Sequence, residues 1–565
     1  MFSYPNPRTT DPIERRRQRI FEFIPGFLTW FTLIGMFVFS FLLPVWVAVF
    51  IIAFDIYWLF RTIYISFYSV VAYRKLERHK RIDWMDCCRK ISDPDNFLNQ
   101  VSLELKKLKK EYRKKIWRFS KSCKAIKKKI CSVREIKKEI ESVIKNKDKM
   151  LDWNEIYHVV MFPTANEGPE IIEPAIQAVA DSDYPNDKFI ILLATEERED
   201  KKKREHKINY LKSKFGNKFY DFLVTVHKVE KGEMKAKASN TTFAAKRLKK
   251  YLEARKIPLE KVILSNFDCD TCAHPQYFAA LTFKFITDPK RLQFAYQPLP
   301  MYHNNIWDTN AFVRIIVTGS SFWHMIKAMQ PEHMVTFSSH SEPFKTIVDV
   351  DYWPVNVISE DSVIYFKCFN YFNGDYQVKP VYLPVSLDAV LTSSYWKTVI
   401  NQYKQKRRWA YGIENFPLLA RAFLRNNKIA LTKKARHLFT MLEGHHSWAT
   451  NAVIIAFLGW LPVILGGSEF NETVLSHNLP YITRNLMNLA LIGLIVSMFL
   501  SLLLLPPRPR RYSQKRYIYM FLQWFLVPVV TVFLGAVPAI DAQTRIMLGK
   551  YFGEFWVTDK IRKKG

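Results

Sequence analysis

The sequence predicts an α/β protein anchored in a membrane, with a soluble α/β domain between N-terminal and C-terminal transmembrane helices. Three observations predict this. Long uncharged runs lie near the two ends of the 565-residue chain, the centre alternates short apolar strands with helices, and a strongly basic segment separates the first run from the centre. We therefore expect an N-terminal transmembrane hairpin, a basic helical insert, a cytosolic α/β domain, and C-terminal interface and transmembrane helices, at residues 1–73, 74–150, 151–430 and 431–565.

The composition excludes several other classes of protein. The chain has a formal charge of +32, and 49% of its residues are apolar. These values exclude a disordered chain, a collagen-like fibre and a small disulfide scaffold. High charge and high apolar content occur together because they are segregated along the chain.

The first apolar run is long enough for two membrane spans. Residues 23–54 carry no charge, and only Asp55 and Arg61 interrupt the run before Tyr73. About 50 residues allow two spans of about 20 with a tight turn, which we expect near Pro44. Basic residues on both flanks place both ends of this hairpin on the cytoplasmic side. They are Arg15, Arg16, Arg17 and Arg19 before the run, and Arg74, Lys75 and Arg78 after it.

The C-terminal region contains three further apolar runs. Residues 447–468 and 486–505 are uncharged and predict a second hairpin, which basic residues at 508–516 return to the cytoplasm. The third run, residues 517–540, is interrupted by prolines and a glycine and is also flanked by basic residues. Because 24 residues cannot cross a bilayer twice, part of this run is expected to be re-entrant or to lie in the interface. The number of spans after residue 505 stays open.

The basic insert has the pattern of a helix or a helical hairpin. Residues 101–150 hold 19 Lys and Arg residues against six Asp and Glu, and contain no Gly or Pro. Apolar residues recur at steps of three and four, as on one face of a helix. Such a charge run fits either nucleic acid or anionic lipid headgroups. Since membrane spans lie on both sides of the insert, we favour the membrane surface and expect no nucleic-acid partner.

Strands and helices alternate through the centre of the chain. Apolar strands are expected at 157–162, 189–193 and 262–267, and helices after Glu167, around 203–214 and over 237–252. This order indicates an open, mostly parallel sheet with helices on both faces. Ligands of such sheets bind at the carboxyl ends of the strands. Two polar segments lie there, Pro163-Thr164-Ala165-Asn166-Glu167 and Asp268-Cys269-Asp270.

Asp268 and Asp270 are candidate ligands of a divalent cation. They are separated by one residue at the end of a predicted strand. Two carboxylates there can hold a hard cation such as Mg or Mn and leave positions for phosphate oxygens and water. The same pattern occurs in solvated turns, but its placement at a strand end favours the metal site.

Together with other motifs, these segments resemble the membrane-embedded family 2 glycosyltransferases of the cellulose synthase and hyaluronan synthase type. The resemblance covers roughly residues 155–565 and, in outline, the N-terminal hairpin. The chain departs from the family at Ala165, where an aromatic residue is usual, and in the basic insert. No cyclic-di-GMP-binding domain is expected after Lys560. The motifs, in the family's order, are Pro163–Glu167 (PTANE), Lys235-Ala236-Lys237-Ala238-Ser239-Asn240, Asp268-Cys269-Asp270 (DxD), Ser359-Glu360-Asp361, Gln405-Lys406-Arg407-Arg408-Trp409 (QxxRW) and Phe555-Trp556-Val557-Thr558-Asp559-Lys560 (FxVTxK).

The resemblance implies a GT-A (Rossmann-like) domain that transfers a hexose with inversion from a nucleotide-sugar donor, for which UDP is the expected nucleotide. A divalent cation on Asp268 and Asp270 would neutralise the leaving diphosphate. Positive side chains add charge-assisted hydrogen bonds to the same oxygens. The residues expected to bind the nucleotide sugar are Thr164, Asn166, Glu167, Glu196, Lys235, Asn240, Asp268, Arg408, Thr558 and Lys560.

The acceptor side involves two further motifs. An acceptor hydroxyl must lose its proton as it attacks the anomeric carbon, and Asp361 is the expected general base, with charge balance from Glu360. Trp409 offers a flat apolar face on which a pyranose ring can stack. Gln405 belongs to the same motif and is expected to bind the acceptor. Ser338 and Ser339 match an acceptor-channel lining loosely.

Three functions compete. The first is processive β-glycan synthesis coupled to export through the chain's own spans. The alternative is single transfer of a sugar to a lipid carrier or membrane lipid, and the third is a non-catalytic scaffold that presents the basic helices. QxxRW and FxVTxK favour the first, and the intact DxD and Ser-Glu-Asp motifs argue against the third. The expected partners are the nucleotide-sugar donor, a glycan or lipid acceptor, the lipid bilayer and an export partner, at the plasma (inner) membrane with the catalytic domain in the cytoplasm. The sequence does not name the sugar or the linkage.

Overall fold

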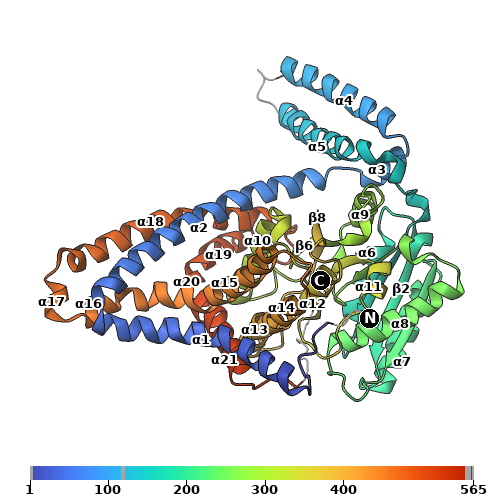
Figure 1. Ribbon diagram of the computed structural model, residues 1–565. Helices are drawn as coiled ribbons and strands as arrows, with labels where there is room; N and C mark the ends of the chain where they lie inside the picture. Colours follow the sequence, from blue (N-terminus) through green and yellow to red (C-terminus); the bar gives the residue numbers. More distant parts are fainter. Residues whose placement is uncertain (1–3, 116–120, 554–561, 563–565) are drawn as a thin grey trace.

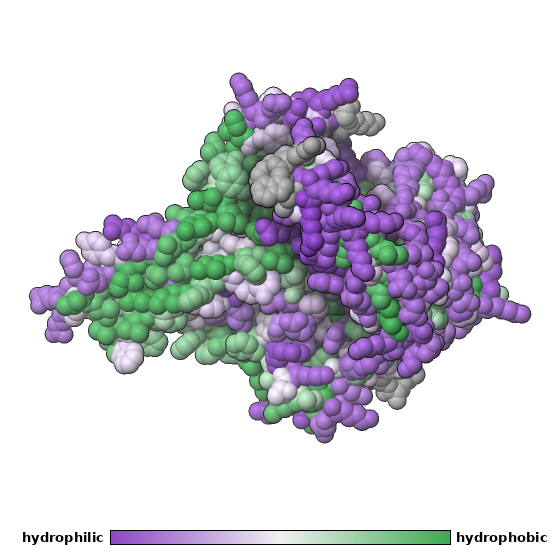
Figure 2. Space-filling view, turned by 90° about the horizontal axis from the view of Figure 1, so that it is seen from above, coloured by the Kyte–Doolittle hydropathy of each residue, from purple (hydrophilic) through white to green (hydrophobic). Residues whose placement is uncertain are grey.

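The computed structural model describes residues 4–115, 121–553 and 562 (Figure 1). Long helices extend to one side of a sheet unit, which comprises the sheet and the helices packed on it, and a helical hairpin projects from the molecule near the junction. Figure 2 shows apolar side chains gathered over the long helices and hydrophilic ones over the sheet unit. The predicted fold class, an α/β unit with apolar helices at both ends of the chain, is confirmed.

The N-terminal hairpin turns where the sequence predicts. Helices α1 (Pro12–Leu42) and α2 (Pro44–His79) are separated by Leu43 alone. Pro44 begins α2, a position where its missing N–H costs no helical hydrogen bond. Helix α18 (Val474–Leu503) packs along α2.

Four helices among the described residues are long and apolar enough to cross a membrane. They are α1, α2, α18 and the helical run Arg516–Met547. A bent pair, Leu431–Ala456 and Leu458–Leu465, turns through 53° and would add a fifth. It contains α15 (Leu431–Ala456) and α16 (Leu461–Leu465), and α17 (Gly467–Asn471) then leads to α18. The second hairpin is therefore present, with a bent outgoing limb.

The third C-terminal run is one row of helical segments whose two ends contact the sheet unit. Near its start, the Arg516 guanidinium donates to the carbonyl of Trp307 at 3.2 Å. Near its end, Ala542 and Ile546 pack with Met234. These contacts agree with the prediction that both flanks of the run share one side of the membrane. The segments are α19 (Arg516–Leu522), η10 (Gln523–Leu526), α20 (Val527–Thr531), the π-helical η11 (Val532–Ala536) and α21 (Val537–Met547).

The sheet has eight strands in the order β3-β2-β1-β4-β7-β6-β8-β5. The first four are parallel, as predicted, but β7 is antiparallel to both β4 and β6, and β5 is antiparallel to β8. β6 and β8 are again parallel, so four of the seven neighbouring pairs are parallel, as a mostly parallel sheet requires, and the three antiparallel pairs were not predicted. The strands are β1 (Tyr157–Pro163), β2 (Phe189–Glu196), β3 (Asp221–His227), β4 (Val262–Asn266), β5 (Cys272–Ala273), β6 (Phe294–Met301), β7 (His340–Pro343) and β8 (Gln377–Ser386).

Apolar clusters cover both faces of the parallel half. Alternate residues of a strand point to opposite faces, so Val160 and Phe162 pack in one cluster and Val159 and Met161 in the other. The helices expected after Glu167, around 203–214 and over 237–252 are all present. The helices of the sheet unit are α6 (Pro169–Ala180), α7 (Lys201–Phe215), α8 (Lys237–Ala254), α9 (Tyr277–Ile286), α10 (Ala311–Ala328), α11 (Phe344–Asp349), α12 (Glu360–Tyr371), α13 (Tyr395–Ala410) and α14 (Asn415–Arg425).

The basic insert forms a helical hairpin. After the short α3 (Trp84–Lys90), α4 (Pro94–Lys115) and α5 (Lys121–Val143) pack against each other through an apolar stripe that includes Leu105 and Ile130. Glu135 of α5 lies 3.6 Å from Arg78 and 4.0 Å from Lys75, both near the end of α2. The hairpin is therefore attached where the second N-terminal helix meets the sheet unit (Figure 1).

Candidate active site

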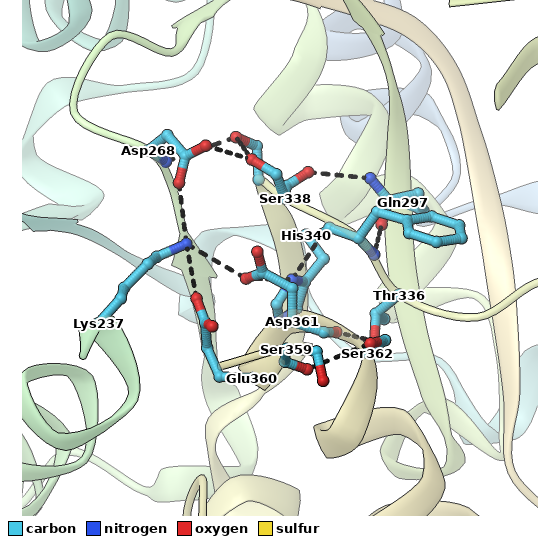
Figure 3. A network of polar contacts seen from close by, with 12 residues as sticks. Lys237, Asp268, Gln297, Thr336, Ser338, His340, Ser359, Glu360, Asp361 and Ser362 are labelled. Carbon is cyan, nitrogen blue, oxygen red and sulfur yellow. Dashed lines mark hydrogen bonds and ion pairs between the residues drawn. The ribbon is translucent and has the colours of Figure 1, made fainter. Parts of the chain in front are cut away.

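Three elements bring four charged side chains together at the carboxyl edge of the sheet. Asp268 follows β4, Glu360 and Asp361 begin α12, and Lys237 begins α8. The Lys237 ammonium lies 2.9 Å from Oδ1 of Asp268, 3.2 Å from Oδ1 of Asp361 and 3.4 Å from Oε1 of Glu360 (Figure 3). The predicted DxD and Ser-Glu-Asp motifs thus meet around one lysine that the motif analysis had not singled out.

The helix dipole favours some of these charges and disfavours another. Acidic residues in the first turn of a helix are favoured by the positive end of the helix dipole, as for Glu360 and Asp361 in α12. Lys237 is the first residue of α8, where the same dipole disfavours a cation. Its three carboxyl neighbours offset that cost.

Burial and neighbouring charge set the ionisation of this cluster. Burial disfavours the charged form of Lys237, but the charge of Asp268, followed by those of Asp361 and Glu360, raises its pKa well above the usual value. Burial first, and then repulsion from Asp361, raises the pKa of Glu360 to about 8. Burial and this repulsion therefore both favour the neutral form of Glu360. The positive charge beside Asp361 comes from Lys237, whereas we had expected Glu360 to provide the charge balance.

A loop before β7 fixes the acids from the opposite side. The Ser338 hydroxyl donates to Oδ2 of Asp268 at 2.5 Å, and the Thr336 hydroxyl donates to the backbone carbonyl of Asp361 at 2.5 Å (Figure 3). Nδ1 of His340 lies 3.7 Å from Oδ1 of Asp361. Ser339 has a φ of 64°, and a non-glycine residue in this region carries backbone strain that its surroundings must hold.

Most of the residues that contact these acids were not predicted from the sequence. Lys237 lies within a motif that was noticed, but the expectation fell on Lys235, two residues earlier. Lys235 is exposed, whereas only 11% of the Lys237 side chain is exposed. Thr336 and His340 belong to no motif, and only a loose match pointed to Ser338. No local signal marks Thr336 or His340, because they reach the site through a non-local antiparallel strand.

The loop after β1 is held by its own polar side chains. Oε2 of Glu167 accepts hydrogen bonds from the backbone N–H groups of Ala165, at 2.8 Å, and Asn166, at 3.1 Å. The Asn240 amide donates to the carbonyl of Ala194 at 2.8 Å, and the same carbonyl accepts from the N–H of Thr164. The predicted residues Thr164, Asn166, Glu167 and Asn240 therefore lie together at the ends of β1 and β2 and form this part of the edge of the sheet.

Three buried ionisable side chains lie behind that loop. Lys207 of α7 donates to the hydroxyl of Thr164 at 3.2 Å and to Glu199 at 2.7 Å. Glu196, at the end of β2, is buried and forms an ion pair with Arg198, and burial raises its pKa. Glu196 thus lies at the carboxyl edge of the sheet, as expected, but it already pairs with Arg198.

Helix α13 brings the QxxRW motif to the same region. Burial lowers the pKa of the Arg408 guanidinium, while the charges of Asp268, Glu360 and Asp361 oppose that shift. Trp409 is half-buried and packs on two apolar clusters, which include residues of α10. Gln405 is buried and accepts a hydrogen bond from Gln402 at 3.0 Å.

The two predicted metal ligands differ in access. The Asp268 side chain is 34% exposed, whereas Asp270 is fully buried and accepts a hydrogen bond from the backbone N–H of Asp388 at 2.6 Å. The described residues contain no group of three or more His, Cys, Asp or Glu side chains placed to hold a metal ion. Two carboxylates still fit a cation whose other ligands are phosphate and water. In the arrangement described, both oxygens of Asp268 already have partners, Lys237 and Ser338.

The C-terminal tail returns to the DxD segment. The Arg562 guanidinium forms an ion pair with Asp388 at 2.9 Å and lies 3.5 Å from the carbonyl of Asp270. Thr558 and Lys560 lie outside the described residues, so their predicted contact with the donor stays a prediction. Arg562 itself, two positions after Lys560, lies at this edge of the sheet.

No protein-family model and no curated protein matches the chain. Solved structures do match it at low similarity. The mannosyltransferase PcManGT from Pyrobaculum calidifontis, solved with GDP-Man and Mn²⁺, has a TM-score of 0.34 and 14% identity over 60% of this chain and 86% of its own. TarS 1–349 of S. aureus with UDP-GlcNAc has a TM-score of 0.33 and 12% identity over 60% and 90%. GalNAc-T7 with UDP, GalNAc and Mn²⁺ has a TM-score of 0.31 and 13% identity over 52% and 58%. At these TM-scores the likeness carries no functional argument, and the function has to be derived from the site.

Proposed function

We propose that this protein is an inverting glycosyltransferase that moves a hexose from a nucleotide-sugar donor, with UDP as the nucleotide, to a growing β-glycan at the cytosolic face of the plasma membrane. One observation carries the proposal. A half-buried acid after β4, an acid pair at the start of α12 and the cations Lys237 and Arg408 share one site at the carboxyl edge of the sheet. Such sheets bind nucleotides at that edge.

The donor side of the site suits a diphosphate. Arg408 and Lys237 provide positive charge that forms charge-assisted hydrogen bonds with phosphate oxygens. Asp268 and Asp270 would hold a divalent cation, which when bound supplies Lewis-acid neutralisation of the leaving diphosphate. The returning tail adds Arg562 near the same edge, and Thr558 and Lys560 are proposed to close over the donor, as lids do.

The acceptor side suits proton removal from a hydroxyl. Asp361 is 23% exposed and is oriented through its backbone by Thr336 and through its side chain by Lys237. As general base it takes the proton of the acceptor hydroxyl while the C–O bond to the anomeric carbon forms and the bond to the diphosphate breaks. A single displacement inverts that carbon, so an α-linked donor gives a β-linked product. Burial, which raises the pKa of the neighbouring Glu360, limits the negative charge beside Asp361.

The membrane helices favour a polymer that leaves the cell through this chain. Trp409, proposed to stack on the acceptor, packs against α10 and against the run Arg516–Met547, so the acceptor site adjoins the apolar helices. A growing glycan bound there would leave along those helices, with or without an export partner. The alternative product, one sugar on a lipid carrier or membrane lipid, would use the same chemistry.

The test is to incubate membranes that contain the full chain with labelled UDP- and GDP-sugars, and to measure the size and anomeric configuration of the product. A β-linked polymer supports the proposal, and a lipid with one sugar supports the alternative. If wild-type membranes transfer no more sugar from any donor than membranes with the Asp361→Asn variant, the polymer and the one-sugar lipid are both contradicted.

A further inference from the structure

Lys237 occupies the centre of the acidic cluster, beside Asp268, one of the two acids that would hold a divalent cation. Its ammonium has three carboxyl neighbours within 3.4 Å, and the exposed fraction of its side chain is 11%. Figure 3 shows the side chain reaching from α8 toward the acids that begin α12 and the acid that follows β4. The lysine therefore neutralises the site from within the protein.

This position conflicts with simple binding of a divalent cation. Oδ1 of Asp268 faces Lys237, and Oδ2 accepts the Ser338 hydroxyl. Asp270 is buried, with one carboxylate oxygen held by the N–H of Asp388. A divalent cation that approaches Asp268 comes close to the ammonium of Lys237, and because like charges at such short separation repel strongly, the cation competes with the lysine for this carboxylate.

We propose that Lys237 is a displaceable internal counter-ion, which competes with a divalent cation for Asp268 and moves its contact to Asp361 and Glu360 when that cation arrives. The proposal rests on the proposed function, because the cation is taken to accompany a nucleotide sugar. The lysine needs no new partner for this exchange. It already lies 3.2 Å from Asp361 and 3.4 Å from Glu360, so a small shift of the flexible side chain suffices.

This exchange makes binding of the divalent cation depend on the presence of the donor. Without a donor, a divalent cation at Asp268 would join a positive charge, Lys237, that already lies 2.9 Å from that carboxylate. A donor diphosphate adds the negative charge that makes a second cation favourable. The free protein should therefore bind the metal weakly, and the acids remain neutralised until the donor is present.

The test measures Mn²⁺ binding to purified full-length protein by electron paramagnetic resonance of the free ion, without nucleotide. We expect Lys237→Met, which has a side chain of similar length and no charge, to bind Mn²⁺ at least about tenfold more tightly than the wild type, because the competing ammonium is gone. Lys237→Arg keeps the charge and should stay close to the wild type. Lys231→Met removes a charge at an exposed position in the loop before α8 and should leave Mn²⁺ affinity unchanged.

Two further variants protect the test against misfolding and indirect effects. If Lys237→Met does not purify as a monodisperse protein, Lys237→Gln replaces it with the same expectation. Asp268→Asn in the Lys237→Met background should remove the gain, because the cation and the lysine share that carboxylate. Equal Mn²⁺ affinity in wild type and Lys237→Met, or a gain that survives Asp268→Asn, overturns the proposal.

The result is separable from the fate of the proposed function. Tighter Mn²⁺ binding in Lys237→Met together with no sugar transfer from any donor would retain the counter-ion and reject the glycosyltransferase. Sugar transfer by the wild type with no change in Mn²⁺ affinity in Lys237→Met would retain the enzyme and reject the counter-ion.

Discussion

Replacing Asp361 by asparagine tests the proposed general base directly. The substitution keeps the size of the side chain and removes its charge and its ability to accept a proton. Lys237 retains Asp268 at 2.9 Å, and the Thr336 hydrogen bond goes to the backbone carbonyl, so the local fold should persist. The lost repulsion also favours ionised Glu360, because Asp361 is one cause of its raised pKa.

We expect the substitution to lower the rate of sugar transfer and not the affinity for the donor. General-base assistance is typically worth about 10²–10⁴ in rate, which corresponds to roughly 2.7–5.4 kcal/mol of transition-state stabilisation. We expect kcat of Asp361→Asn to fall by at least about 10², while the dissociation constant of the donor changes little, because the base acts on the acceptor.

The assay follows transfer of labelled sugar by the purified variant at saturating donor, with donor affinity measured separately by calorimetry. Asp375→Asn is the matched control, since it makes the same chemical change at an exposed acid that pairs with Lys290 on the surface. Turnover of Asp361→Asn within about twofold of that control would remove Asp361 from the role of base.

Three further outcomes follow from the site and its surroundings. Asp270→Ala should abolish transfer, and EDTA should abolish it until Mg²⁺ or Mn²⁺ is restored; full activity in excess chelator would reject the metal assignment. Truncation after Gly553 should leave a folded membrane protein with little transfer activity, and Lys560→Ala should weaken donor binding more than acceptor binding; normal rate and donor affinity in the truncated protein would exclude a gating tail. Deletion of residues 95–148 should weaken membrane or partner association more than catalysis, and the isolated segment should bind anionic liposomes less as salt rises; salt-resistant binding to DNA without lipid binding would reverse that assignment.

Sequence periodicity was sufficient for the elements that depend on local pattern. The apolar runs predicted the N-terminal hairpin and its turn at Pro44, and the continuous apolar stretches predicted β1, β2 and β4. Helix periodicity predicted the α4–α5 hairpin of the insert. In each case the signal lies within a few neighbouring residues, because burial of one helix face or one strand imposes a short repeat on the chain.

The second half of the sheet depends on contacts that no local pattern records. β7 has four residues, and its antiparallel pairing with β4 joins segments more than 70 residues apart. That pairing carries Ser338 and His340 to the acids, and no spacing rule within the sequence links them to Asp268. From the sequence alone, a strand as short as this cannot be distinguished from a loop, because its pairing partner is not known.

The sequence by itself predicted which acids are candidates for the chemistry, and DxD and Ser-Glu-Asp each lie at the end or the start of an element at one edge of the sheet. Only the tertiary structure decided which cation stands among them. Lys235 and Lys237 are chemically identical and two residues apart, yet one is exposed and the other lies within 3.4 Å of three carboxyl groups. The difference arises because α8 begins at Lys237 and is oriented by its packing on the sheet. The direction of a side chain at a helix start is fixed by such non-local packing, and a linear motif does not contain it.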